Sequence, residues 1–224
     1  MLANLPAYIT IVFILTCFLT LWFLWKASNS MTVVIVALIW LLIQGILSYS
    51  GFYLNSQGTP PRIALAVIPP LILIILILST KPGTQFIRHL KLKRLHLLHI
   101  VRIPVEFCLY WLSVHKAVPE LMTFAGNNFD IAVGITAPIL YFTCFKRREV
   151  RSKNLLFAWN IIGLVFLGSI VVKAILSAPT IFQKLAFDQP NIAIFYFPFV
   201  WLPCFIVMAV LFSHLVMIKR LMTT

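Results

Sequence analysis

The sequence has few charged residues for its length. Of its 224 residues, 10% are charged and 62% are apolar, whereas charged residues make up about a quarter of a typical soluble domain. Only five residues are acidic: Glu106, Glu120, Asp130, Glu149 and Asp188. Such a composition excludes a soluble globular enzyme, a disordered chain and a secreted disulfide module. It predicts an all-α, polytopic membrane protein that forms one integral membrane domain over residues 1–224.

Paired cysteines and glycosylation acceptors are also absent. No C-x-x-C pair and no N-x-S/T motif occurs, and no basic residue precedes the first apolar run, so no cleaved signal peptide is expected. Four cysteines fall inside apolar segments, where small buried side chains are the simplest interpretation: Cys17, Cys108, Cys144 and Cys204. We therefore predict neither a metal site nor a cofactor.

The net charge of +13 does not indicate a nucleic-acid partner. The basic residues form short clusters between long apolar runs, and no basic face is interleaved with aromatic residues for base stacking. Clusters beside membrane spans orient the helices and contact anionic lipid headgroups. The partners expected from this pattern are the lipid bilayer and a small solute, with a homo-oligomer left open.

Seven apolar stretches approach the length of about 20 residues that a helix needs to cross a bilayer. The backbone must satisfy its own hydrogen bonds in lipid, so these stretches predict a seven-helix bundle. The fifth stretch is short. The predicted spans are residues 5–25, 31–53, 62–80, 95–114, 129–145, 155–176 and 192–218. The basic stretch at residues 83–95 is expected to extend the fourth helix, with a separate surface helix as the alternative.

The basic residues predict the orientation of the bundle. Thirteen Lys and Arg fall in the connections on one side of these spans and three on the other. Cytoplasmic loops carry the excess of positive charge, so the N-terminus is expected outside and the C-terminus inside. We accordingly predict a multi-pass protein of the plasma membrane.

An internal repeat appears when the sequence is shifted by 129 residues. Seven of 24 ungapped positions are then identical, and both copies contain P-x-I-A-x-x-x-x-P, at residues 61–69 and 190–198. The match predicts two parallel three-helix repeats joined by the fourth helix, a layout that resembles the SWEET carriers. Seven-helix opsins share the helix count, but the last span has no central lysine for retinal.

Four short motifs resemble an uncharacterised family of small bacterial multi-pass membrane proteins. They are R-I-P-V-E at residues 102–106, V-P-E-L-M-T-F at 118–124, N-F-D-I at 128–131 and F-P-F-V-W-L-P at 197–203. The resemblance implies a multi-pass membrane protein and supplies no activity, substrate or site.

The fourth span carries the densest set of polar residues. At 100° per residue they fall on a stripe about 120° wide, and such a face must look into the bundle or a wet cavity. These residues are His96, His99, Arg102, Glu106, Tyr110 and Ser113. Arg102 and Glu106 are spaced to pair, with Arg102 holding an anionic or hydroxylated group and Glu106 acting as a protonatable partner. The alternative is a purely structural ion pair.

Prolines and isolated polar residues supply secondary predictions. Prolines leave carbonyls unbonded at membrane depth, which favours either gates or static kinks; they are Pro69, Pro70, Pro104, Pro198 and Pro203. His99 and His214 lie at similar depth and suggest a proton relay or, as an alternative, haem ligation. Lys173 either reaches the membrane interface or lines the path. Glu120 and Asp130 are predicted at an outer mouth, where Asp130 also suits a helix cap.

Three functions compete on this evidence. The first is a carrier or permease for a small polar or anionic solute, bound by Arg102, Glu106, Tyr110, Ser113 and His99 in a cavity lined by the fourth span. The second is a seven-helix receptor that does not use retinal. The third is a haem-binding redox protein or an enzyme, which is disfavoured because no nucleophile with a base and no phosphate-binding loop occurs.

Overall fold

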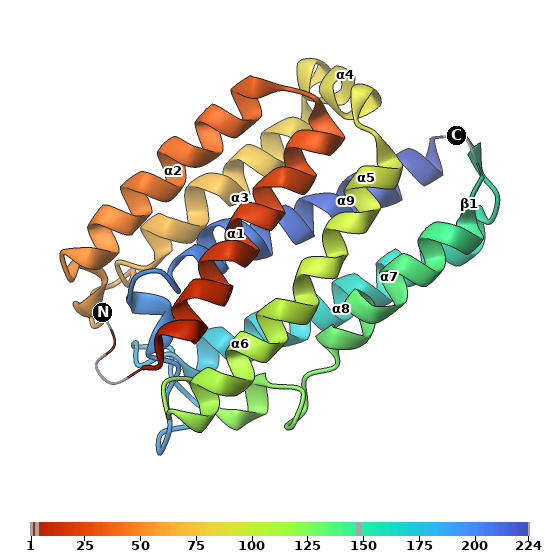
Figure 1. The fold of residues 1–224 in the computed structure, drawn as a ribbon. Helices are drawn as coiled ribbons and strands as arrows, with labels where there is room; N and C mark the ends of the chain where they lie inside the picture. The colour runs from red at the N-terminus through yellow and green to blue at the C-terminus, as the bar shows by residue number, and fades with distance from the viewer. Residues whose placement is uncertain (1, 3–4, 147–148, 224) are drawn as a thin grey trace.

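A computed structural model describes residue 2, residues 5–146 and residues 149–223 (Figure 1). The described chain is almost entirely helical. Its α-helices are α1 (Ala7–Ser28), α2 (Met31–Tyr49), α3 (Ala64–Ser79), α4 (Lys81–His89), α5 (Leu92–Leu97), α6 (Arg102–Val114), α7 (Asp130–Cys144), α8 (Lys153–Ser177) and α9 (Val207–Met222). Short 3₁₀ turns are η1 (Phe52–Leu54), η2 (Leu98–Val101), η3 (Glu120–Met122) and η4 (Ala193–Phe195), and η5 (Leu202–Ile206) is a π-helix. The strands β1 (Phe145–Lys146) and β2 (Glu149–Val150) form one antiparallel hairpin.

Within the described residues, five helical segments are long and apolar enough to cross a membrane. They are Ala7–Ser28, Met31–Tyr49, Leu92–Val114, Lys153–Ser177 and Leu202–Met222. Helices α3 and α4 together form a sixth candidate that is bent by 88°, and α7 has only 15 residues. At 1.5 Å per residue α7 is about 22 Å long, short of a bilayer core of about 30 Å. The all-helical architecture is confirmed, and the length and composition of these helices fit a membrane protein, while seven spans and their orientation stay predictions.

Helix α4 replaces the predicted extension of the fourth span. It leaves the axis of α3 at 88° and ends where Leu90 turns extended, before α5 begins. Thr80 caps its N-terminus by accepting a hydrogen bond from the Gly83 N–H at 3.3 Å. A Cβ on Gly83 would lie 2.1 Å from the carbonyl oxygen of Ile77, so only glycine lets α4 fold back this closely.

The last span begins ten residues later than predicted. Residues 192–201 form the 3₁₀ turn η4 and further turns, and helical structure starts at Leu202. Pro198 cannot donate to a helical ladder and disfavours a helical conformation in Phe197 before it, so the helix does not start earlier. The apolar side chains of this segment, such as Phe195 and Phe199, are buried in the protein core. Their hydropathy therefore does not indicate a membrane span.

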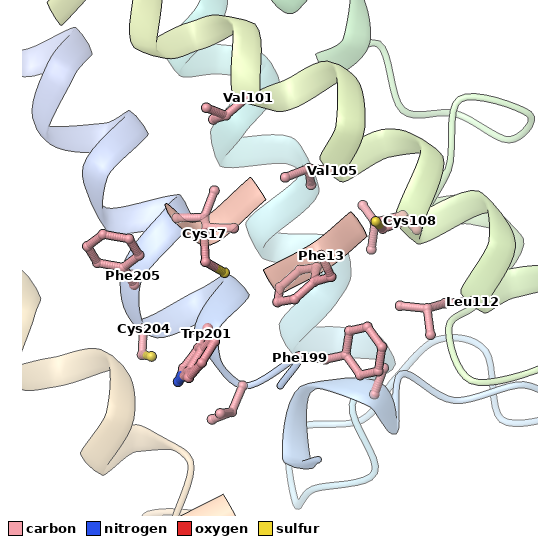
Figure 2. Close-up of a cluster of buried hydrophobic side chains, with 14 of the residues drawn as sticks. Phe13, Cys17, Val101, Val105, Cys108, Leu112, Phe199, Trp201, Cys204 and Phe205 are labelled. Carbon is pink, nitrogen blue, oxygen red and sulfur yellow. The ribbon is translucent and has the colours of Figure 1, made fainter. Parts of the chain in front are cut away.

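The core lies around α1, which packs against α2 on one side and against α5 and α6 on the other (Figure 1). Figure 2 shows Phe13 and Cys17 of α1 facing side chains of η2 and α6 and of the turns before α9. The rings of Phe13 and Phe199 lie 5.1 Å apart. All four cysteines are buried and free, which confirms that they act as small core side chains.

The two copies of the proline motif differ in conformation. Pro69 lies inside α3, whereas its counterpart Pro198 lies in the turns ahead of α9. The parallel repeat therefore stays a prediction.

Candidate functional site

The polar stripe of the fourth span divides into a buried part and a peripheral part. His96, His99, Arg102 and Glu106 are buried on the continuous segment Leu92–Val114. Tyr110 is 37% exposed and stacks on Phe124 with ring centroids 5.1 Å apart. Ser113 is half-buried near the end of α6, where its carbonyl accepts a hydrogen bond from Gln189 at 2.9 Å. The structure thus brings together four of the six predicted stripe residues.

Arg102 pairs with Asp130, which corrects the expected pairing with Glu106. The Arg102 Nη1 donates to Asp130 Oδ1, and both side chains are buried. Asp130 is the first residue of α7. Helices α6 and α7 approach closely at Gly134, where a Cβ would lie only 2.9 Å from Ile103 Cγ1. Tertiary packing therefore gives Arg102 a partner 28 residues away rather than the carboxylate one turn along its own helix.

His214 is the second partner of Arg102. The Arg102 Nη2 lies 2.7 Å from His214 Nε2, and His214 Nδ1 lies 2.9 Å from Asn160 Oδ1. Because a guanidinium only donates, Nε2 accepts and the neutral imidazole carries its proton on Nδ1, donating to Asn160. Asn160 in turn donates from Nδ2 to the Leu156 carbonyl at 2.7 Å. Asp130, Arg102, His214 and Asn160 thus form one hydrogen-bonded chain across α6, α7, α8 and α9.

A histidine and tryptophan cluster continues from His214. The rings of His99 and His214 stack with centroids 4.0 Å apart, and Trp159 lies 5.2 Å from His99 and 4.7 Å from His96. His99 Nε2 lies 3.0 Å from Ser213 Oγ, and His96 Nε2 lies 2.9 Å from the Ala137 carbonyl. Two imidazoles in direct contact leave no room for a haem between them. Among the described residues no group of three His, Cys, Asp or Glu side chains is arranged to hold a metal ion.

Glu106 accepts its hydrogen bond from Asn128, a partner that the sequence did not predict. Asn128 Nδ2 lies 2.6 Å from Glu106 Oε1, and Asn128 Oδ1 accepts from the backbone N–H of Asp130 at 3.1 Å. The second oxygen, Oε2, is buried and has no hydrogen-bond partner. In the sequence, Asn128 stands out only as part of the N-F-D-I motif, and its reach to Glu106 depends on how the loop before α7 folds back.

A largely apolar cavity of about 290 Å³ lies beside this carboxylate. Glu106 and Asp130 line it, together with apolar side chains of α3, α6, α8, η5 and α9. Its lining residues Ile68, Ile175 and Phe182 are each about half exposed, so the cavity reaches the surface beside α3 and α8. Arg102 is not among the lining residues. The wall therefore offers hydrogen-bond acceptors, and an anion would face two carboxyl groups.

The remaining predicted residues lie apart from this network. Lys173 donates to the Asn127 carbonyl at 2.5 Å, and Glu120 is exposed at the start of η3. Pro104 lies in the first turn of α6, Pro203 lines the cavity from η5, and Pro69 and Pro70 line a second, separate groove. Pro198 lies outside any helix. A shared gating role for these prolines stays a prediction.

Comparisons with known proteins give one match. Residues 60–222 match a protein-family model described as Domain of unknown function (DUF8737). No curated protein matches the chain, and no solved structure matches it. The matched segment contains every side chain of the network described above. It fits the predicted resemblance to an uncharacterised family, whereas a bacterial origin and the layout of SWEET carriers gain no support.

Proposed function

The chain belongs to the family described as Domain of unknown function (DUF8737), and from its interior site we propose that it is a membrane carrier for a small amphiphilic solute. The proposal rests on one observation: the carboxylate of Glu106 lines an apolar cavity of about 290 Å³, and its buried Oε2 has no hydrogen-bond partner. Ionisable side chains inside membrane spans are costly and generally mark solute or ion pathways. A ligand that donates a hydrogen bond to the Glu106 carboxylate offsets part of that cost.

The lining of the cavity selects the chemistry of the solute. Val105, Leu109 and Leu167 offer apolar contact, while Glu106 and Asp130 offer acceptors at one point of the wall. We therefore propose a solute with an ammonium or other donor group on an apolar body, rather than the anionic solute expected from Arg102. Because Asp130 also binds Arg102, a cation at this wall competes for the same carboxylate and couples solute binding to the Arg102–His214 contact.

Replacing Glu106 by Gln tests this assignment. Phenethylammonium and its near-isosteric anion phenylpropionate serve as probes for uptake into proteoliposomes. We expect saturable uptake of the amine only, and about a 10- to 100-fold lower apparent affinity in Glu106→Gln, because a charge-assisted hydrogen bond contributes about 1.5–3 kcal/mol. The exposed carboxylate of Glu120 provides the control, and Glu120→Gln should transport as wild type does. Uptake of the anion, uptake of neither probe, or an unaffected Glu106→Gln variant would contradict the proposal.

We further propose that the chain spans the plasma membrane seven times with its N-terminus outside, counting α7 and the α3–α4 pair as spans. The partition of thirteen against three basic residues supports this orientation. The surface opening of the cavity, beside Ala178 and Phe182, then lies on the outer side.

Single cysteines on either side of α7, at His115 just after α6 and at Lys153, the first residue of α8, test whether this short helix spans the membrane. His115 and Lys153 are exposed, and the four native cysteines are buried. In intact cells, a membrane-impermeant maleimide should label His115→Cys, and it should label Lys153→Cys only after permeabilisation. Labelling of both from the same side would make α7 a re-entrant helix and reduce the number of spans.

A further inference from the structure

A second groove, unrelated to the Glu106 cavity, lies between α2 and α3. Its volume is about 560 Å³, and its floor is formed by α9 and η5 through residues such as Cys204 and Met208. Val36 and Ile39 of α2 and Leu73 of α3 line it and are each about half exposed, so the groove is open along its side. Its lining is almost wholly apolar.

The length of the groove matches one leaflet of a bilayer. Its lining on α2 runs from Thr32 to Ile43, eleven residues apart, which is about 16 Å along a helix at 1.5 Å per residue. Half of a hydrocarbon core of about 30 Å is about 15 Å. A single extended acyl chain that enters at the Thr32 end therefore fits the groove over its full depth.

Three basic residues neighbour the lining residues at the end of the groove near Thr32, although none of them lines the groove itself. Ala27 and Leu90 line this end, and the N–H of Lys91, the residue after Leu90, donates to the Ala27 carbonyl at 2.9 Å. Lys91 and Arg88 are exposed, and Lys26 lies beside Ala27 with its Nζ 4.3 Å from the centre of the Trp25 ring. The first acidic residue in the sequence is Glu106, so helices α1 to α5 supply no carboxylate to neutralise these cations.

We propose that this groove is a binding site for an anionic glycerophospholipid. One acyl chain lies between α2 and α3, and the phosphate lies against Lys26, Arg88 and Lys91. Basic pockets between membrane helices are a recurrent means of binding such headgroups, and each Lys or Arg near the surface contributes about 1 kcal/mol. The site shares no lining residue with the Glu106 cavity except Met208, and the proposal does not depend on the carrier function.

Tryptophan quenching by brominated lipids tests the site directly. Trp40 lines the groove, so bromine on the acyl chain of a bound lipid quenches its fluorescence. The protein is titrated in detergent with brominated phosphatidylglycerol or brominated phosphatidylcholine, and the Trp40→Phe variant identifies the part of the quenching due to Trp40. We expect tighter quenching by phosphatidylglycerol, and about 100-fold weaker binding in the triple variant Lys26→Gln, Arg88→Gln and Lys91→Gln, since about 1 kcal/mol per charge is roughly fivefold.

Two control variants separate a site from a general charge effect. The triple variant Arg151→Gln, Lys153→Gln and Lys184→Gln removes the same charge from exposed positions outside the groove, and it should bind as wild type does. Ala37→Phe places a ring in the groove and should abolish Trp40 quenching by both lipids. The proposal is overturned by equal quenching from the two lipids, by equal loss in the two triple variants, or by displacement with glycerol phosphate alone. A wild-type dimer that Ala37→Phe converts to a monomer would assign the groove to a second copy and would also overturn it.

Discussion

Replacing Asp130 by Ala is expected to lower the free energy of unfolding by about 3–5 kcal/mol, because it leaves the buried Arg102 guanidinium without its counter-charge. Arg102 is 2% exposed, and its other side-chain hydrogen bond is to the neutral imidazole of His214. The backbone N–H of residue 130 keeps its bond to Asn128 in the variant, so the change isolates the lost charge. Thermal or urea unfolding in detergent measures the effect.

A double variant separates the cost of an unpaired charge from the contribution of the pair. Arg102→Met combined with Asp130→Leu removes both ions and replaces them with apolar side chains, so stability should return to within about 1 kcal/mol of wild type. Asp188→Asn, on an exposed carboxylate, should unfold as wild type does. Two results would show that Asp130 is not the partner of Arg102. One is that Asp130→Ala is as stable as wild type. The other is that Arg102→Met with Glu106→Leu, and not Arg102→Met with Asp130→Leu, restores the stability of wild type.

Local patterns predicted which residues are buried, and tertiary packing decided which of them meet. Apart from the start of the last span, apolar length located the long helices to within a few residues, because burial in lipid imposes that length directly. The i, i+4 spacing suggested Arg102 with Glu106, yet the close approach of α6 and α7 at Gly134 supplies Asp130 instead. A contact between residues 28 positions apart leaves no periodic signature in a single sequence.

The turns at residues 192–201 show a second limit of hydropathy. Phe195 and Phe199 are apolar because they pack in the protein core rather than because they face lipid, and the two environments give the same sequence signal. Pro190, Pro198 and Pro203 were visible in the sequence and marked where a helix is hard to continue. These prolines fit the boundary at Leu202 better than apolar length does, although the span predicted from the sequence contained Pro198 and Pro203.

Helix α8 offers a matched pair of glycines that tests the buried polar chain. A Cβ on Gly163 would lie 2.4 Å from Cε1 and 2.7 Å from Nε2 of His214, whereas a Cβ on Gly168 would have no atom within 4 Å. Gly163→Ala must displace the imidazole that links Arg102 to Asn160. Overpacking costs about 1–3 kcal/mol, and an unsatisfied buried donor adds about 1–3 kcal/mol, so we expect a loss of about 2–6 kcal/mol.

Gly168→Ala makes the same chemical change one and a half turns further along the helix and should stay within about 1 kcal/mol of wild type. Comparing the two unfolding midpoints cancels the effect of glycine on helix propensity and isolates the contact with His214. A second comparison identifies what that contact does. His214→Ala opens the space that Cβ needs, so the double variant Gly163→Ala with His214→Ala should be no less stable than His214→Ala alone. Additive losses in the double variant would mean that Gly163 acts through the packing of α8 rather than through His214, and the Arg102–His214–Asn160 chain would lose its independent support.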